Sequence, residues 1–266
     1  MTVDTGDLRC PACGSPTLPG PRSGPCPACL LRLALEDDGA GDECGVHDDE
    51  SEPGPEYRVV TLLDPGEGVT TYLARRVDGC ELVELSVAPL GSGLSSEAFM
   101  ARVRQMTRLR HPGLARVFAG RMTDQGDCCL VAEYVAGQPV AQYCERVGIA
   151  PHEAMRLFDQ ACVAIAYAHA NGVAHGSLRP ESVLAIAAGP TVAAKVTGWG
   201  VCAARSSPDD DVAGLAGILR TLALVPGLSG SLVPVLDRVL GAAARRAHES
   251  VGALRAAAAI GSAPAP

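Results

Sequence analysis

The chain has 266 residues, of which 47% are hydrophobic, 3% aromatic and 20% charged, with a formal net charge of -8. This length suits one ordinary domain of roughly 200 residues and one small module. No run approaches the ~18 apolar residues of a membrane helix, and no basic segment leads into an apolar stretch at the N-terminus. We therefore expect no membrane contact and a cytoplasmic location.

The negative charge is concentrated in one stretch of the chain. Residues 36–56 contain ten acidic residues and no lysine or arginine, so the remainder is near neutral. A nucleic-acid surface would need a basic face, and the sequence has only short arginine groups such as the one within 102–110. We therefore expect protein partners and no nucleic-acid partner.

The first 35 residues contain two CxxC pairs with twelve residues between them. The four cysteines are Cys10, Cys13, Cys26 and Cys29. Two such pairs supply the four thiolates of a tetrahedral structural zinc site, and so short a segment cannot build a core without such a staple. We predict a zinc ribbon over 1–35. Redox-active CxxC motifs are the alternative, although these normally lie on a larger scaffold of strands and helices.

Residues 36–55 are acidic, rich in Gly and Pro and nearly free of bulky apolar side chains. Such a segment cannot bury enough surface to fold, so we predict an extended, disordered linker. Cys44 and His47 lie within it and are either a further metal pair or, as we favour, solvated side chains. A folded domain is predicted over 56–260, followed by a disordered tail over 261–266.

Short apolar runs between turn residues predict five strands in the first half of the folded domain. In chain order they cover 57–63, 70–75, 82–88, 117–118 and 128–135. Between the third and fourth strands, Ser95 can cap a helix over 95–109. Phe99, Val103 and Met106 fall on one face of this helix, so that face should be buried.

The second half of the domain is predicted to be mainly helical. The clearest helix covers 151–170, beginning at Pro151 and ending before Gly172. The pattern also predicts a hairpin with strands at 183–186 and 193–196. Two buried helices are predicted at 212–224 and 232–243. This order of elements predicts an α+β fold.

Four local strings resemble bacterial Ser/Thr protein kinases of the Hanks type. They are LVAEYV at 130–135, like the hinge; HGSLRPES at 175–182, like the catalytic loop; KVTGWG at 195–200, like the magnesium-binding turn; and DVAGL at 211–215, like the start of the large C-lobe helix. The resemblance spans 57–259 and implies a bilobal fold with a small β-rich N-lobe and a reduced helical C-lobe. A ribbon ahead of a kinase domain is also similar to a layout common in this group.

The resemblance implies that the residues of phosphoryl transfer have been replaced. In the family a lysine binds the phosphates, acidic and amide side chains hold magnesium, and an aspartate acts as the base. The lysine position matches Ser86, and its glutamate partner matches Arg102. The catalytic aspartate matches Ser177. The magnesium-binding asparagine and aspartate match Ser182 and Gly198.

The nucleotide cleft is degenerate by the same comparison. Asp64 and Val69 replace two of the three glycines of the family's glycine loop, so an acid and a β-branched residue oppose the phosphates. Lys195 is the only lysine of the chain, and its matched position points away from nucleotide. The residues that would line a remaining cleft are Gly66, Val69, Ala132, Glu133 and Val135.

These replacements predict a protein without kinase activity. Loss of a general base alone typically costs ~10²- to 10⁴-fold in rate, and the metal ligands contribute further stabilisation. We interpret the chain as an inactive kinase-like domain that binds, scaffolds or regulates, with structural zinc and without functional ATP and magnesium. Two alternatives stay open: a Ser/Thr kinase or ATP-binding transferase with non-standard catalytic residues, and metal-free nucleotide binding without turnover. Trp199, at the family's phenylalanine, either fills the core between the lobes, as we favour, or plugs the empty metal site.

Overall fold

The computed structural model describes the central part of the chain. The described residues are 57–64, 68–77, 81–90, 94–123, 126–188, 191–200, 207–228, 230 and 232–234. The predicted ribbon, linker and tail, together with Gly66, lie outside them. The chain divides into two compact units, Met1–Val103 with Val117–Tyr134, and Arg104–Arg116 with Val135–Pro266. Among the described residues no helix has the length and apolar character needed to cross a membrane.

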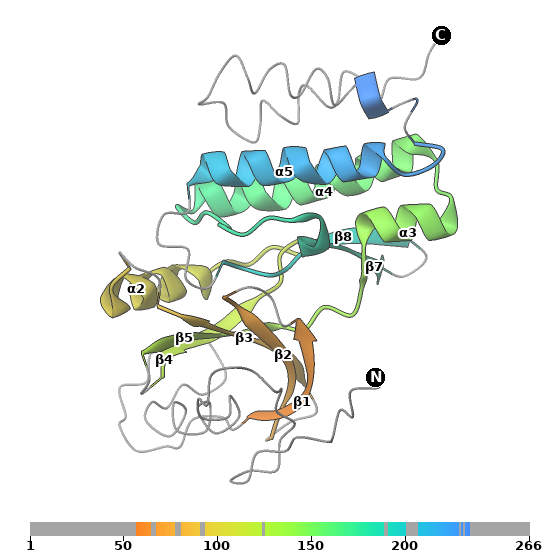
Figure 1. Cartoon of the computed structure of the whole chain (residues 1–266). Helices are drawn as coiled ribbons and strands as arrows, with labels where there is room; N and C mark the ends of the chain where they lie inside the picture. The colour runs from red at the N-terminus through yellow and green to blue at the C-terminus, as the bar shows by residue number, and fades with distance from the viewer. Residues whose placement is uncertain are drawn as a thin grey trace, which may run out of the picture. The chain divides into compact units, whose positions relative to one another are not determined.

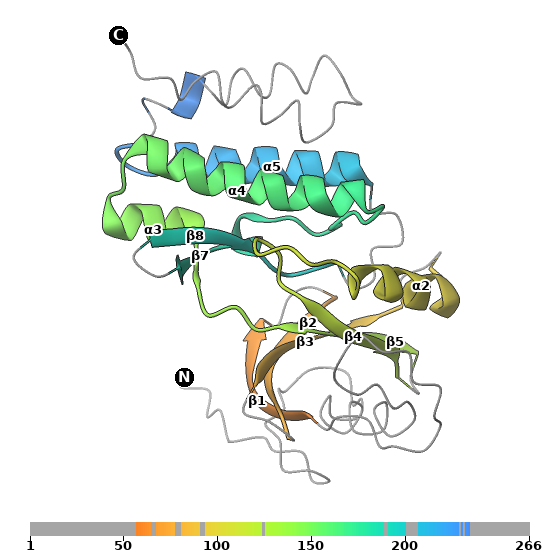
Figure 2. The same cartoon turned by 180° about the vertical axis from the view of Figure 1, so that it is seen from behind.

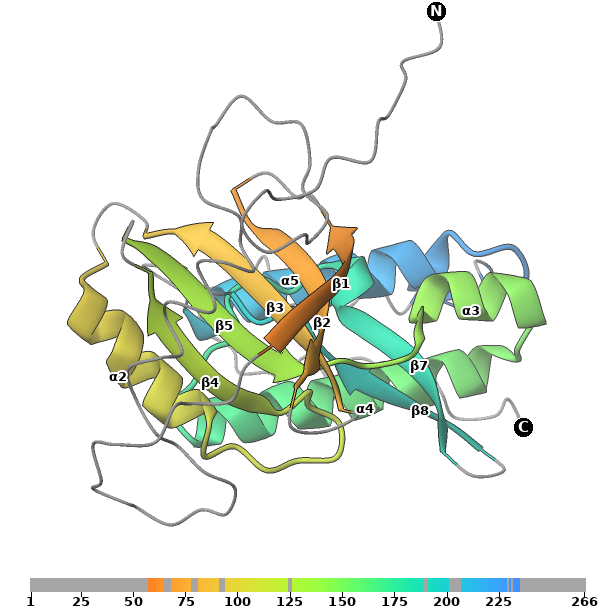
Figure 3. The ribbon, with the colours of Figure 1, turned by 90° about the horizontal axis from the view of Figure 1, so that it is seen from below.

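The first unit contains a five-stranded antiparallel sheet (Figures 1 and 3). Its strands are β1 (Tyr57–Asp64), β2 (Thr70–Arg76), β3 (Leu82–Pro89), β5 (Asp127–Glu133) and β4 (Val117–Met122), in this spatial order. Because side chains alternate along a strand, each face of the sheet takes every second residue. One face forms a cluster of buried residues: Tyr57, Val59, Ala74, Val83, Leu85, Cys129 and Val131.

The opposite face of the sheet packs against helix α2 (Ser96–Met106). Gly120 of β4 pairs with Leu130 of β5. A Cβ added at Gly120 would lie 2.6 Å from Cγ2 of Val103 on α2. The helix therefore approaches the β4 backbone as closely as a glycine allows. Ser86 pairs with Leu130 from the other side and so shares this face.

The second unit is mainly helical. It contains α3 (Val140–Val147), α4 (Pro151–Ala170) and α5 (Pro208–Ala223). It also has a short sheet of β6 (Gln138–Pro139), β7 (Val183–Ala188) and β8 (Thr191–Val196), and the 3₁₀ turn η1 (Pro180–Ser182). Figures 1 and 2, seen from opposite sides, both show α4 and α5 lying side by side.

Helix α4 is the centre of the second unit, and it begins at the N1 proline that the sequence predicted. Its fully buried residues include Leu157, Phe158, Ala161 and Ile165, at the three- and four-residue spacing of one helix face. Burial of this apolar stripe, at about 25 cal/mol per Å² of apolar surface, is what holds the helix in place.

Most of the predicted elements are confirmed, with a few corrections. The strand predicted at 117–118 extends to Met122, because Gly120 breaks the apolar pattern but is required under Val103. The helix predicted over 95–109 ends at Met106 and continues as a turn. The helix predicted over 212–224 begins earlier, at Pro208.

Three short elements were missed in the sequence, namely β6, α3 and η1. Helix α3 has eight residues, of which only Val140 and Cys144 are buried, so its pattern is too short to recognise. Of the helix predicted over 232–243, the structure describes 232–234, which are helical.

Candidate functional site

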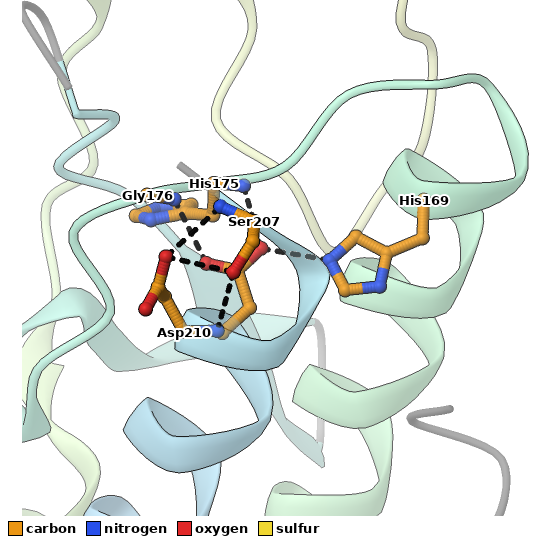
Figure 4. A network of polar contacts seen from close by, with 6 residues as sticks. His169, His175, Gly176, Ser207 and Asp210 are labelled. Atoms are coloured by element: carbon orange, nitrogen blue, oxygen red, sulfur yellow. Dashed lines mark hydrogen bonds and ion pairs between the residues drawn. The ribbon is translucent and has the colours of Figure 1, made fainter. Parts of the chain in front are cut away.

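The start of α5 places one carboxylate in the interior of the second unit. Ser207 caps the helix: its Oγ accepts a hydrogen bond from Asp210 N at 3.2 Å, and Asp210 Oδ2 accepts one from Ser207 N at 2.9 Å (Figure 4). This reciprocal box satisfies two backbone amides and sets where the helix begins. The next residue, Asp211, is 0% exposed.

Asp211 joins the loop at 175–177 to helix α4. Its Oδ2 accepts a hydrogen bond from His175 N at 2.7 Å and lies 2.7 Å from Nε2 of His169 on α4. Its Oδ1 accepts a hydrogen bond from Gly176 N at 2.8 Å. Figure 4 shows His169, His175 and Gly176 converging on this point from α4 and the loop. A side chain of α5 thus helps to hold the loop in place.

The pKa of Asp211 reflects two opposed effects. Burial raises the pKa of its carboxyl, but the hydrogen bonds from His169 and from the amides of Gly176 and His175 outweigh burial and leave the pKa below its ordinary value. Asp211 is therefore ionised at neutral pH, when its charge strengthens each of these bonds.

Two glycines allow the close packing around this loop. A Cβ at Gly214 of α5 would lie 2.6 Å from Cβ and 2.8 Å from the carbonyl oxygen of Leu178. A Cβ at Gly200 would lie 3.0 Å from the carbonyl of Gly176. The loop at 175–178 is therefore enclosed between α5 and the residues after β8.

Ser182, at the position matched to the magnesium-binding asparagine, is 4% exposed. Its Oγ donates to the carbonyl of Ser177 at 3.2 Å and accepts from Arg179 N at 3.2 Å. Its own carbonyl accepts from Thr197 N at 2.8 Å. The hydroxyl is thus engaged inside the loop, where it stabilises η1.

Gly198, at the position matched to the metal-binding aspartate, has a φ of 74°. Gly176, in the loop that Asp211 holds, has a φ of 78°. Residues with a side chain rarely adopt this left-handed backbone conformation, whereas glycine adopts it without a steric cost. A Cβ at Gly198 would lie 3.5 Å from Oγ of Ser182, so the structure brings these two matched positions together. In the part of the chain that the structure describes, no three His, Cys, Asp or Glu side chains group closely enough to hold a metal ion.

Trp199 fills the core of the second unit and is 4% exposed. Its ring stacks on that of His175, with centroids 4.8 Å apart and planes at 25°. Its Nε1 donates to the carbonyl of Ala115 at 3.0 Å. Trp199 is therefore a core residue of the second unit, and all these contacts lie inside that unit. The expected position between the two lobes stays a prediction.

The remaining predicted positions lie mostly in the first unit. Ser86 is 7% exposed, and its Oγ lies 3.3 Å from Oγ1 of Thr71 on the neighbouring strand. Arg102 is half-buried on α2, next to Val103. The expected cleft residues are placed as follows: Val69 half-buried before β2, Ala132 buried and Glu133 half-buried at the end of β5, and Val135 buried in the second unit.

Sequence reasoning missed three residues that contact the positions described above: His169 and Ala115 in the second unit, and Thr71 in the first. His169 had one available signal, since a histidine ends the clearest predicted helix six residues before His175. Ala115 and Thr71 gave none, because the first acts through its backbone carbonyl and the second through strand pairing.

The family model described as protein kinase domain matches residues 66–217. The chain is 29% identical over 198 residues to the serine/threonine-protein kinase PknA of Mycobacterium tuberculosis, covering 68% of this chain and 43% of PknA. It is 31% identical over 140 residues to CBL-interacting protein kinase 25 of Oryza sativa subsp. japonica, covering 48% of this chain and 26% of that protein. The chain thus spans less than half of the length of these curated relatives.

Among solved structures, the chain resembles the crystal structure of Rad53 1–466 in complex with AMP-PNP. The TM-score is 0.56 at 15% identity, and the match covers 74% of this chain and 63% of that one. This likeness shows the fold, and it confirms the predicted kinase-like α+β architecture of a β-rich and a helical part.

Proposed function

Because the chain belongs to the protein kinase domain family, we propose that it has kept the family's fold, has lost phosphoryl transfer, and acts as a binding, scaffolding or regulatory module. One observation carries this proposal: the matched positions for phosphate binding, magnesium and the base hold no lysine, carboxylate or amide. The residues there are Ser86, Arg102, Ser177, Ser182 and Gly198.

The phosphate-binding pair is the first loss. A kinase needs a lysine on the third strand in an ion pair with a glutamate of the following helix. Here the third strand has Ser86, whose hydroxyl contacts Thr71 on the adjacent strand. The matched helix residue is Arg102, which has the wrong charge to hold a lysine. Neither half of the ion pair is present to orient a nucleotide.

The base and the magnesium ligands are the second loss. A serine hydroxyl such as that of Ser177 cannot accept a proton near neutral pH without a base of its own. The Ser182 hydroxyl is engaged by Ser177 and Arg179 within the loop. Gly198 has no side chain to offer a metal. ATP with magnesium therefore finds no ligands at the matched positions.

The loop at 175–178 is well supported by contacts with α5. This favours a protein that keeps a stable kinase-like fold over one whose fold has been weakened. Asp211 accepts hydrogen bonds from the amides of His175 and Gly176. Because Gly214 has no side chain, Leu178 packs closely against α5. These contacts stabilise the fold without taking part in chemistry. They support a role in which the surface of the domain, and not its catalytic loop, is used by protein partners.

We also propose that Cys10, Cys13, Cys26 and Cys29 hold a structural zinc ion. Support comes from the residue types and from the twelve residues between the two pairs. All four cysteines lie outside the described residues. The ribbon would give the protein a second small module for contact with a partner.

The test is a phosphoryl-transfer assay on the full chain, with labelled ATP, magnesium and casein as the acceptor, alongside thermal unfolding with millimolar ATP in the presence and absence of magnesium. We expect no label on casein or on the chain and no magnesium-dependent rise of the unfolding midpoint. Magnesium-dependent transfer would overturn the proposal in favour of a kinase with non-standard residues. A rise in the midpoint without transfer would instead establish nucleotide binding without turnover.

A further inference from the structure

The turn at 197–200, which the resemblance matches to the magnesium-binding turn, is enclosed by contacts from three sides within the second unit. In kinases the corresponding turn must be in place for the metal to bind. Here the metal-binding side chain is replaced by Gly198, while the turn itself is tied to its surroundings by backbone and side-chain bonds. The question is whether this turn can still move.

The first set of contacts comes from the strand-like segment at 113–115. Ala115 N donates to the carbonyl of Val196 at 2.7 Å, and Val196 N donates to the carbonyl of Gly113 at 2.8 Å. A Cβ at Gly113 would lie 3.1 Å from Cβ of Ala164, so the segment lies directly on α4. The residue before the turn is therefore bonded to a segment that α4 supports.

The second contact is the Trp199 side chain. Its indole Nε1 donates to the carbonyl of Ala115 at 3.0 Å, where Ala115 is 1% exposed. A phenylalanine, the family's usual residue, has no donor for this carbonyl. A buried carbonyl that loses its donor lowers the stability of the fold, so movement of Trp199 out of the core breaks this bond at a cost in free energy.

The third set of contacts comes from the loop that Asp211 holds. Gly200 N donates to the carbonyl of His175 at 3.0 Å, and Nε2 of His175 lies 3.1 Å from the carbonyl of Thr197. The His175 ring also stacks on Trp199. Since His175 N is bonded to Asp211, the turn is connected to α5 on this side.

Together these contacts form a closed series around the turn, called the ring of contacts below. They run from α4 through 113–115 to Trp199, then to His175 and Asp211, and back to α4 at His169. Gly198 also allows the left-handed backbone without a steric cost, so its positive φ adds no strain to the turn.

From this geometry we infer that the turn at 197–200 is a permanent structural lock, with Trp199 as its closing residue, and is not a switch. The turn keeps one conformation without nucleotide or metal. The absence of a nucleotide-driven state rests on the proposed function, because a working kinase would need the turn for metal binding, whereas the rigidity of the turn rests on its contacts alone. It adds that the protein has no nucleotide-driven state at this turn.

The test is native-state hydrogen exchange on the full chain over increasing urea. The reporters are the amides of Val196, Thr197 and Gly200, which donate to Gly113, Ser182 and His175 respectively. We expect them to exchange only through global unfolding, at the same opening free energy as the core amides of α4. Exchange through a local opening, at rates well above those of α4, would overturn the lock.

Substitution of the closing residue gives the second measurement. Trp199→Phe keeps an aromatic ring but removes the donor to Ala115, so we expect the same three amides to exchange at least about fivefold faster through a local opening. Tyr167→Phe is the matched control: it removes one hydroxyl that accepts from Arg110 N at 3.2 Å, outside the ring of contacts. Equal exchange in Trp199→Phe and the unaltered chain would show that the indole does not close the lock.

The fluorescence of the single tryptophan provides a check that needs no variant. Acrylamide quenching should stay low and constant through all urea concentrations below the global transition. An earlier rise in quenching would overturn the lock. These outcomes are separate from those of the proposed function: phosphoryl transfer with unchanged exchange would overturn that function and not the rigidity of the turn, whereas local opening without transfer would do the reverse.

Discussion

Nε2 of His169 lies 2.7 Å from Oδ2 of Asp211, a contact that joins the end of α4 to the start of α5. The same carboxylate accepts hydrogen bonds from the backbone amides of His175 and Gly176. One buried acid thus holds two helices and a loop together. Because three groups depend on its charge, its protonation should be visible in the stability of the whole chain.

Asp211 should make stability depend on acid pH. Its pKa is lowered in the folded state, so the carboxylate stabilises the fold above its unfolded pKa of about 3.9, and this contribution is lost as the pH falls through the lower folded value. Asp211→Asn should lower the free energy of unfolding by about 2–4 kcal/mol at pH 7 and flatten its decline below pH ~4. Urea denaturation at a series of pH values measures both effects.

The control for this variant is Asp209→Asn, which changes an exposed acid two residues earlier in the same helix. It should change stability far less than Asp211→Asn at pH 7. Equal losses in the two variants would mean that the charge of the helix start, and not the three bonds to Asp211, is responsible.

Two glycines three residues apart in α5 should respond to alanine with opposite signs. A Cβ at Gly214 would lie 2.6 Å from Cβ of Leu178, so Gly214→Ala should destabilise by about 1–3 kcal/mol. A Cβ at Gly217 would meet nothing within 4 Å, so Gly217→Ala should stabilise by about 0.5–1 kcal/mol through helix propensity. Urea denaturation of both variants tests the contact between α5 and the loop. Stabilisation by Gly214→Ala would contradict it.

A lysine restored at position 86 should not restore a kinase. Ser86 is 7% exposed beside Thr71, so Ser86→Lys would bring a charge into a buried site and should cost about 1–3 kcal/mol of stability, with no phosphoryl transfer. Ser86→Ala, which removes only the hydroxyl, should cost less than about 1 kcal/mol. Denaturation and the transfer assay together distinguish these results.

A double-mutant cycle tests whether positions 86 and 102 correspond to the family's ion pair. Adding Arg102→Glu to Ser86→Lys should recover about 0.5–3 kcal/mol relative to the sum of the single changes, because the introduced charges would attract. Additive effects would show that these side chains do not meet, and the matched position on α2 would then be wrong.

Zinc content tests the proposed ribbon. The purified full chain should hold about one zinc ion, measured by elemental analysis, because four thiolates complete a structural site. Cys10→Ser with Cys26→Ser removes one ligand from each pair and should abolish binding. Cys44→Ser, within the acidic stretch, should leave the zinc content unchanged. A chain without zinc, or one that keeps it after the double change, would contradict the ribbon.

The amino-acid sequence by itself determined the elements whose signals are local. Helix α4 has the bounds Pro151–Ala170 that the pattern predicted, since a proline start and a four-turn apolar stripe are both contained within the segment. Strands β1, β2, β3 and β5 were found within two residues of their ends, because alternation and turn residues are also local signals. The resemblance of short strings to the kinase family also matched catalytic positions to residues of this chain, and the loss of catalysis at those positions stays a prediction.

Only the tertiary structure decided which residues meet across long stretches of chain. Trp199 bonds to a carbonyl 84 residues earlier, and Asp211 bonds to an amide 36 residues earlier. The full length of β4 was hidden because Gly120 breaks its apolar pattern, and the need for that glycine comes from Val103 on a different element. Such partners carry no signal in a linear pattern, because packing between elements selects them after each element has formed.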